Sequence, residues 1–245
     1  MSKKLFRKNI LITGGSSELG AHFVSRALRE GARVFFTYHR NEKVARKLSR
    51  SGAFGFRLDL ASSAEIGALV RTLSKKTSRL DVLIHNAAIA QEASLLHLSE
   101  AAWDRQMAVN LKAPYLLTQQ LLPLFAENKG GGKILMVTSR VAVCGTAGLS
   151  AYAASKAGVI GLVRTLALEL GPSGIRVNAV SPGFMLSSMT RSAGEDVLER
   201  NRQRSVLGQF SDPAEVADFL VHLCSDRMSG VSGQVLHYES RPIPG

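Results

Sequence analysis

The stretch NILITGGSSELG, residues 9–20, decides the fold of this chain. An apolar run ends in Thr13, Gly14 and Gly15, and an amphipathic helical pattern begins at about residue 18. Glycines in such a turn let backbone N–H groups approach a pyrophosphate at the N-terminus of the helix. A tight glycine turn between a strand and a helix is also common without a ligand. Glu18 adds a carboxylate that would repel a pyrophosphate if it pointed inward, so the loop alone leaves nucleotide binding open.

Apolar runs and helical patterns alternate along the whole chain, without an internal repeat or a long linker. Several runs are nearly continuous, as in strands that are covered on both faces. Strands are expected at residues 9–13, 33–38, 54–58, 80–87, 133–139, 175–181 and 234–238. Helices are expected at about residues 18–30, 41–50, 62–77, 99–127, 152–170 and 212–224. The alternation predicts an α/β fold, a Rossmann-type, doubly wound sheet of about seven mostly parallel strands with helices on both faces.

Local features support these helices and mark one exception. Ser62, Ser99 and either Ser211 or Asp212 are expected as N-caps. Residues 183–208 are polar and rich in Ser and Arg, and they begin at a Pro-Gly pair. We predict a loop and a short helix there that act as a mobile substrate lid. Residues 1–245 are then one dinucleotide-binding and catalytic domain with this lid.

Length and composition favour an ordinary globular protein. The chain has 245 residues, 45% of them apolar, which is enough for one domain with a sizeable core. No apolar run approaches the roughly 20 residues of a membrane span, and the first run is too short for a signal peptide. Cys144 and Cys224 show no metal-ligand spacing. We therefore expect a cytoplasmic protein with reduced thiols, no structural metal and no membrane partner.

The net charge of +12 is concentrated at one end of the chain. Residues 1–50 hold 12 Lys and Arg and three acidic residues, so +9 of the +12 lies there. Two interpretations stay open: a solvated basic surface, or a patch that attracts an anionic cofactor or an acidic partner. A nucleic-acid partner is not expected, because no helix-turn-helix, zinc finger or basic stripe with interleaved aromatic residues is present.

The end of the second predicted strand bears on coenzyme choice. Tyr38, His39 and Arg40 follow one another there, and no acidic residue occurs between Glu30 and Glu42. An acid at this place usually binds the ribose hydroxyls of NAD, whereas a cation suits the 2′-phosphate of NADP. The sequence therefore favours NADP(H) over NAD(H), although Arg40 could simply begin a solvated helix.

Asp59 closes the third predicted strand. Its carboxylate could accept a hydrogen bond from the adenine amino group of a cofactor. It could equally cap the helix that begins near Ser62, and the sequence does not separate the two roles.

A second group of residues indicates catalysis. Ser139 ends a predicted strand, Tyr152 follows 13 residues later, and Lys156 comes four residues after the tyrosine. Residues at i and i+4 share one helix face, so the phenol and the ammonium can meet the same site. A phenol with a pKa near 10 is a poor acid at pH 7, and a neighbouring cation is expected to lower its pKa.

Together these features resemble the short-chain dehydrogenase/reductase family, and the resemblance covers nearly all of the chain. Residues 13–20 are similar to its cofactor loop, and HNAA at 85–88 is similar to its Asn-Asn-Ala-Gly element. The catalytic tetrad of the family matches Asn110, Ser139, Tyr152 and Lys156. The stretches PGFMLSSMT, DPAEVADFLVHLCSD and VSGQVLHY most resemble the 3-oxoacyl-(acyl carrier protein) reductase group.

The resemblance implies an NADPH-dependent carbonyl reductase that turns a 3-oxoacyl thioester of acyl carrier protein or CoA into its 3-hydroxyacyl form, in fatty acid or polyketide biosynthesis. Ser139 would bind the carbonyl oxygen, Tyr152 would protonate it, Lys156 would hold the ribose, and Asn110 would position a water. A homotetramer or homodimer is also implied. The cofactor-binding residues would be Gly14, Ser16, Ser17, Glu18, Leu19, Tyr38, His39, Arg40, Asp59, Leu60, Asn86, Ala87, Ala88, Tyr152, Lys156, Pro182, Gly183 and Met185.

Four departures from the family pattern stand out. Glu18 replaces a glycine, Ala88 replaces another, and Ser17 stands where NADP-dependent relatives often have a basic residue. The end HYESRPIPG replaces a small Asn-Gly-Gly turn, which puts the tetramer in question. At the first turn of a helix a carboxylate can face solvent and interact favourably with the helix dipole. We therefore expect Glu18 to be tolerated, with cofactor affinity about tenfold weaker.

Alternatives remain for partner and function. Basic residues on a proposed approach face could dock an acidic acyl carrier protein, or they could be ordinary solvated charges: Lys129, Lys133, Arg191, Arg200, Arg202 and Arg204. An NAD(P)-dependent alcohol or sugar dehydrogenase is the second enzyme class. A non-catalytic scaffold of the same fold is the third possibility, which the complete tetrad disfavours.

Overall fold

The computed structural model describes residues 3–128, 130–187, 189–190 and 194–242, and one seven-stranded sheet organises them. The strand order is β3-β2-β1-β4-β5-β6-β7, and every neighbouring pair is parallel. The strands are β1 (Asn9–Ile12), β2 (Arg33–Tyr38), β3 (Phe54–Arg57), β4 (Val82–His85), β5 (Gly132–Val137), β6 (Ile175–Ser181) and β7 (Val235–His237). The predicted α/β fold and its seven strands are confirmed.

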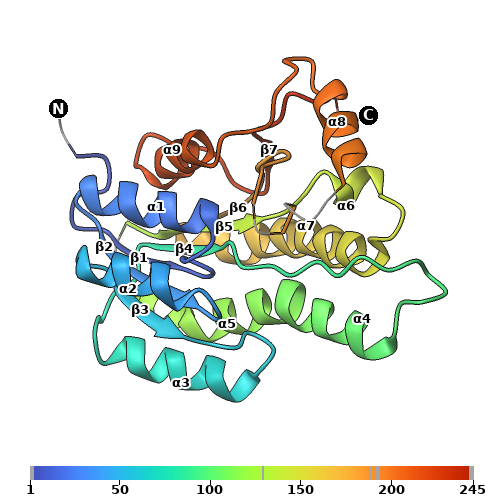
Figure 1. The fold of residues 1–245 in the computed structure, drawn as a ribbon. Coiled ribbons are helices and arrows are strands. Elements are labelled where there is room, and N and C mark those ends of the chain that lie inside the picture. Colours follow the sequence, from blue (N-terminus) through green and yellow to red (C-terminus); the bar gives the residue numbers. More distant parts are fainter. Residues whose placement is uncertain (1–2, 129, 188, 191–193, 243–245) are drawn as a thin grey trace.

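Helices cover both faces of the sheet, as in a doubly wound fold (Figure 1). The first face carries α1 (Glu18–Arg29), α2 (Glu42–Arg50) and α9 (Pro213–Cys224). The second face carries α3 (Ser63–Ser74), α5 (Ala113–Ala126) and α7 (Ser150–Leu170). The remaining helical segments are α4 (Glu100–Met107), the π-helix η1 (Ala108–Lys112), α6 (Val141–Cys144), the 3-10 turn η2 (Gly171–Ser173) and α8 (Glu195–Gln203).

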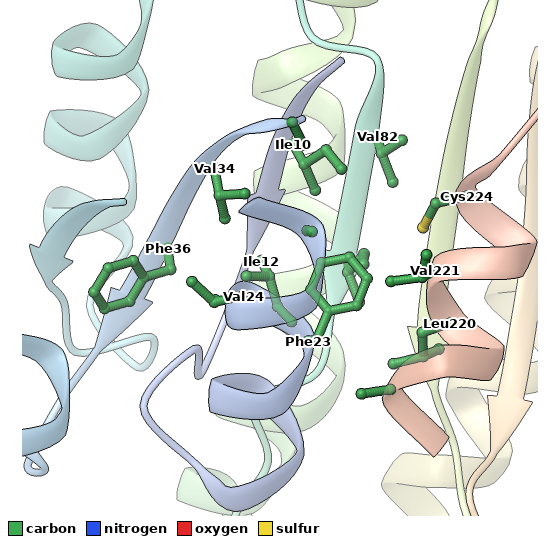
Figure 2. Packing of buried hydrophobic residues seen from close by; sticks show 14 of the residues in the cluster. Ile10, Ile12, Phe23, Val24, Val34, Phe36, Val82, Leu220, Val221 and Cys224 are labelled. Carbon is green, nitrogen blue, oxygen red and sulfur yellow. The ribbon is translucent and has the colours of Figure 1, made fainter. Parts of the chain in front are cut away.

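Alternation along each strand divides the interior into two cores. Ile10 and Ile12 of β1 face the first layer of helices, whereas Leu11 between them faces the second. Figure 2 shows the first core, in which Phe23 of α1 packs over β1 and reaches toward α9. Full burial of one such side chain contributes about 1.5–3 kcal/mol. Because both faces are covered, these strands read as continuous apolar runs.

The predicted helix caps are confirmed. The side chains of Ser62, Ser99 and Asp212 accept hydrogen bonds from backbone N–H groups in the first turns of α3, α4 and α9. Ser17 does the same for α1, where its Oγ accepts from Gly20 N at 3.2 Å. Each cap satisfies one donor that a helix start leaves without an intrahelical partner.

The single helix predicted over residues 99–127 is wrong in its middle. Two α-helices flank the π-helix η1, in which Ala113 N–H donates to Ala108 O, five residues back. Pro114 explains the change, because it has no N–H to donate to the carbonyl of Asn110, four residues earlier. The backbone therefore widens by one residue at Asn110, as π-turns often do at functional sites.

The predicted lid segment contains a loop and α8, which stands away from the sheet (Figure 1). Residues 188 and 191–193, including the proposed docking residue Arg191, lie outside the described part of the chain. Among the helices that the structure describes, none has both the length and the apolar character needed to cross a bilayer.

Candidate active site

The candidate site lies where the direction of strand order reverses. From β1 the sheet continues to β2 on one side and to β4 on the other. The carboxyl ends of these neighbouring strands lead to Thr13 and Asn86 respectively. A crevice outside the carboxyl ends of the strands at such a switch point is the usual ligand site of an open α/β sheet.

The loop after β1 approaches its neighbours too closely for side chains. Gly14 has φ +65°, and a Cβ there would lie 3.0 Å from Ala87 Cα. A Cβ on Gly20 would lie 2.3 Å from Gly14 O, so α1 can start this close to the loop only with glycine at residue 20. These glycines keep the backbone bare at the N-terminus of α1, which is what a pyrophosphate requires. The loop therefore fits the diphosphate of a dinucleotide cofactor.

Hydrogen bonds of Thr13 and Asn86 join the loop after β1 to the loop after β4. Thr13 Oγ1 accepts from the backbone N–H groups of Asn86 and Ala87, each at 3.1 Å. Asn86 Nδ2 donates to Thr13 O at 3.0 Å and to Gly14 O at 3.1 Å, and it lies 3.3 Å from Ser17 Oγ. The amide of Asn86 thus helps to set the shape of the glycine loop, and Ala88, two residues after Asn86, is half-buried.

The other predicted loop residues divide by orientation. Ser16 is buried, and its carbonyl accepts from Asn41 Nδ2 at 3.2 Å. Leu19 packs in the first core, so any cofactor contact from it can come only from its backbone. Glu18 is the first residue of α1 and is half-buried. There its carboxylate lies at the positive end of the helix dipole.

Tyr38 ends β2, and His39 and Arg40 follow it. Tyr38 packs against the first core, with its ring centroid 6.2 Å from that of Phe36. His39 and Arg40 are exposed at the carboxyl end of the strand. An exposed cation at this place, here Arg40, can reach a 2′-phosphate.

The carboxylate of Asp59 is engaged by neighbouring groups. Asp59 Oδ1 accepts from Ala61 N at 3.0 Å, whereas Ser62 caps α3, so the capping alternative for Asp59 is wrong. Arg105 Nη2 lies 3.1 Å from Asp59 Oδ2, and His39 Nε2 lies 4.0 Å from the same oxygen. The backbone hydrogen bond, followed by the pairing with Arg105, lowers the pKa of Asp59. Leu60 beside it packs against the second core.

The predicted catalytic residues converge at the end of β5. Ser139 lies two residues past β5, and its hydroxyl is close enough to the phenol of Tyr152 in α7 to influence the pKa of that phenol. Lys156 lies one turn further along α7, buried, and its Nζ donates to Val137 O at 2.6 Å. The same Nζ is 5.8 Å from the centroid of the Tyr152 ring. Two polar hydroxyl groups can therefore meet one substrate oxygen, with an ammonium nearby.

The expected lowering of the tyrosine pKa is wrong for the free chain. Burial raises the pKa of the Tyr152 phenol, and the hydrogen bond from Ser139 opposes this only in part. Burial also lowers the pKa of Lys156 to about 8. The ammonium is held by the Val137 carbonyl, and desolvation disfavours the charged form of both groups. Tyr152 is therefore a protonated acid at neutral pH.

The side chain of Asn110 is hydrogen-bonded to two segments that border the site. Its Oδ1 accepts from Ile89 N and its Nδ2 donates to Ile89 O, both at 2.9 Å. Nδ2 also lies 3.1 Å from Ser155 Oγ, in the turn of α7 between Tyr152 and Lys156. The side chain thus ties the loop after β4 to the catalytic helix. The main-chain carbonyl of Asn110 receives no hydrogen bond from residue 114, because proline has no N–H. This carbonyl is therefore the group of Asn110 that suits the predicted role of binding a water.

The segment after β6 closes the site on the far side. Pro182 is buried, and Gly183 has φ +77°. A Cβ on Gly183 would lie 2.2 Å from Ser211 Oγ, so no other residue fits without a shift. Met185 packs against the first core. The backbone of this segment, more than the Met185 side chain, is placed at the mouth of the site.

The proposed docking residues do not form one surface. Lys133 is buried, and its Nζ donates to the carbonyls of Leu223, Ser225 and Met228, beyond the end of the sheet opposite the site. Its assignment to an approach face is therefore wrong, because the lysine caps the C-terminal end of α9. Lys129 lies outside the described residues. The exposed arginines on or next to α8 are Arg200, Arg202 and Arg204.

No role in the site is predicted from the sequence for the side chains of three residues that the structure places there: Thr13, Ser155 and Arg105. Thr13 was visible as the residue before the glycine turn, but its hydroxyl contacts join loops 73 or more residues apart in the chain. Arg105 lies in α4, 46 residues from Asp59 in the chain, and the two side chains meet only in the folded protein. The helical spacing of Ser155 between Tyr152 and Lys156 was a usable clue.

Comparison with known proteins agrees with this geometry. A family model described as enoyl-(acyl carrier protein) reductase matches residues 14–240. The 3-oxoacyl-[acyl-carrier-protein] reductase FabG of Thermotoga maritima is 36% identical, over 95% of this chain and 96% of its own. The FabG of Aquifex aeolicus is 31% identical, over 97% and 98%.

Solved structures share the whole fold. A Pseudomonas aeruginosa RhlG/NADP active-site complex has a TM-score of 0.90 and 28% identity, covering 98% of this chain and 97% of that one. A Serratia marcescens short-chain dehydrogenase/reductase mutant also has a TM-score of 0.90 and 28% identity, covering 97% and 98%. The chain therefore belongs to the short-chain dehydrogenase/reductase family and is an NAD(P)-dependent oxidoreductase that acts on C=O and CH–OH groups.

Proposed function

We propose that this chain is an NADPH-dependent carbonyl reductase whose substrate is a 3-oxoacyl thioester of acyl carrier protein or CoA, with Asn110, Ser139, Tyr152 and Lys156 as its catalytic tetrad. The observation that carries the proposal is the convergence of Ser139, just past the carboxyl end of β5, with Tyr152 and Lys156 of α7, whose Nζ lies 5.8 Å from the centroid of the Tyr152 ring. Similarity to reductases named for 3-oxoacyl carrier-protein substrates supports the thioester.

The chain's own residues supply binding and a proton. The reduced nicotinamide, when bound, supplies the hydride. Ser139 donates a hydrogen bond to the ketone oxygen, and Tyr152 gives its proton to that oxygen as it becomes an alkoxide. Burial raises the pKa of the phenol, yet the proton transfer stays favourable, because an alkoxide is a far stronger base than a phenolate. Lys156 would hold the ribose hydroxyls, and Asn110 fixes the loop after β4 to α7, the two segments that would border the cofactor.

The coenzyme is NADP(H) in preference to NAD(H). His39 and Arg40 are exposed after β2, beside the bare glycine loop, and both can face a 2′-phosphate. Asp59, whose carboxylate lies 4.0 Å from His39 Nε2, is paired with Arg105. One structural relative with this fold is an NADP complex. Residues 183–208 act as the substrate lid in this proposal.

The partners follow from the surface. An acidic carrier protein would meet the exposed arginines of the lid, Arg200, Arg202 and Arg204. A homodimer or homotetramer would cover the apolar hollow between α4, α5 and α7, which Met107, Leu111, Tyr115 and Leu162 line. Light scattering measures that assembly directly. The proposed location is the cytoplasm.

A substrate comparison tests the function. Purified protein is given acetoacetyl-CoA or an acetoacetyl carrier protein with NADPH or NADH, and separately secondary alcohols and sugars with NADP⁺ or NAD⁺. We expect thioester reduction with NADPH to have the highest kcat/KM. Oxidation of alcohols without thioester reduction would replace the proposal with a dehydrogenase. Failure to bind either coenzyme in a fluorescence titration would identify a non-catalytic scaffold.

A further inference from the structure

The chain end after β7 folds back over the lid. Residues 238–242 carry the sequence YESRP, which departs from the family pattern. This segment contacts Asn201 of α8 and Phe184 in the segment after β6, so it bridges the two sides of the substrate mouth. In Figure 1, α8 stands away from the sheet near the C-terminal segment. Its position therefore depends on contacts other than those of the two cores.

Arg241 is the centre of these contacts. Its Nε and Nη2 bind the two carboxylate oxygens of Glu239 at 2.7 and 2.9 Å, a bidentate pair. Its Nη1 donates to Asn201 Oδ1 of α8 at 2.7 Å. The side chains of Arg241 and Glu239 are only 10% and 3% exposed. Each of these two side chains depends on the other, because either one alone would be a buried, unpaired charge.

A second set of contacts holds the end of the lid. Ser240 Oγ lies 2.6 Å from Ser205 Oγ, and Val206 N donates to Ser240 O at 3.1 Å. Ser205 is buried, whereas Val206 beside it is exposed. The chain that leaves α8 is therefore fastened to the C-terminal segment by backbone as well as side-chain hydrogen bonds.

The same segment reaches the catalytic loops. The Arg241 guanidinium lies 5.9 Å from the centroid of Phe184, the residue after Gly183. Pro242 O accepts from Arg140 Nη2 at 3.2 Å, and Arg140 directly follows Ser139. A displacement of residues 238–242 would therefore move the start of the lid and the loop of Ser139 together.

We propose that residues 238–242 form a latch that sets the position of the lid over the substrate, with Arg241 as its positioning residue. The effect on catalysis rests on the proposed function, whereas the effect on lid mobility does not. Arg241 touches neither of the hydroxyl groups that meet the substrate, so it acts through Asn201 and Phe184. The latch determines how tightly the acyl group is bound.

The test compares Arg241→Ala, Arg241→Lys and the matched control Arg227→Ala. Arg227 is exposed in the loop after α9 and serves as an arginine outside the latch. For Arg241→Ala we expect KM for the oxoacyl thioester to rise about tenfold or more, with the dissociation constant of NADPH changed less than twofold. Arg241→Lys keeps the charge but lacks the planar guanidinium that makes two parallel hydrogen bonds. Its KM should therefore rise less than that of Arg241→Ala. The control should match the wild type.

Hydrogen exchange gives a readout that needs no substrate. In the full-length protein, the amides of residues 195–208 should exchange about tenfold faster in Arg241→Ala, while those of α7 keep their wild-type rates. Unchanged exchange in the lid would overturn the latch even if activity falls. If the wild type reduces no thioester, this measurement still decides the latch.

A milder variant covers the case in which Arg241→Ala does not fold. Asn201→Ala removes the acceptor on α8 and leaves the Arg241–Glu239 pair in place. Faster exchange confined to residues 195–208, with a higher KM, would support the latch. Wild-type exchange and KM would overturn it.

Discussion

The Lys156 ammonium faces the ring of Tyr152, 5.8 Å from its centroid, and is hydrogen-bonded to a backbone carbonyl instead of the phenol oxygen. The two groups can therefore contact a ligand from different sides. In the proposed mechanism Lys156 would hold a ribose, while the phenol lies near the Ser139 hydroxyl. This division of labour predicts different consequences for changes in the two residues.

Tyr152→Phe should remove the proton donor and leave cofactor binding intact. We expect kcat for the thioester to fall by a factor of about 10²–10⁴, the usual contribution of general acid catalysis, with the NADPH dissociation constant within twofold of the wild type. Tyr115→Phe makes the same change at an exposed tyrosine of α5 outside the catalytic group and is the matched control, with light scattering to check that its assembly matches that of the wild type. Residual activity above a tenth of the wild type would show that another group supplies the proton.

Cofactor binding should weaken as Lys156 loses its charge. Because burial lowers the pKa of Lys156 to about 8, the free enzyme holds an ammonium below pH 8 and an amine above it. The NADPH dissociation constant should therefore rise as the pH passes from 7 to 9.5. Lys156→Arg, whose side chain stays charged, should remove this pH dependence. A wild-type affinity that is flat over this range would contradict a binding role for the charge.

Several of these features were predictable from the sequence because they are local. The continuous apolar strands, the capping residues and the spacing of Tyr152 and Lys156 each depend on neighbours in the chain. The glycine loop of residues 13–20, which includes Ser17, could be located between the first strand and the first helix for the same reason. A helix start, a tight turn and one helix face are all set within a few residues.

Other features depended on contacts between distant segments. Lys133 looked like a surface charge, yet it meets three carbonyls that lie 90 to 95 residues further along the chain. The pKa of Tyr152 follows from burial, which spacing on a helix does not reveal. The π-turn at Asn110 was predictable in principle from Pro114, since the missing donor is a local property.

Gly20→Ala should disrupt the cofactor loop. The added Cβ would lie 2.3 Å from Gly14 O, so the loop must move away from α1. We expect NADPH affinity to fall at least tenfold, because the backbone N–H groups no longer converge on the diphosphate. Gly67→Ala is the control, since its Cβ would meet nothing closer than 3.4 Å in α3. An unchanged affinity in Gly20→Ala would place the cofactor elsewhere.

Neutralising Glu18 should strengthen cofactor binding. Glu18→Gln keeps the length of the side chain and removes its charge from the N-terminus of α1. The NADPH dissociation constant should decrease by up to about tenfold, or about 1.4 kcal/mol. Glu100→Gln provides the control, because Glu100 begins α4 in the same way and should leave the affinity unchanged. If Glu18→Gln also binds NADPH with the wild-type affinity, the Glu18 carboxylate has no influence on the cofactor.

Acid should destabilise the fold through His85. This histidine is buried at the end of β4, with its Nε2 2.8 Å from Thr118 Oγ1, and burial followed by the charge of Lys156 lowers its pKa to about 3. Between the ordinary pKa of 6.5 and about 3, the unfolded chain binds a proton that the folded chain excludes. The free energy of unfolding therefore falls with decreasing pH, by about 1.4 kcal/mol per unit.

The histidine can be replaced by the residue that the family pattern has there. His85→Asn has no group that titrates in this range, so urea unfolding between pH 7 and pH 5 should show about 2 kcal/mol less loss than in the wild type. His97→Asn, which changes an exposed histidine, should keep the wild-type loss. The comparison uses each protein's own value at pH 7, because the smaller Asn side chain also changes packing at every pH. Equal losses in wild type and His85→Asn would show that His85 is protonated in the folded state as readily as in the unfolded chain.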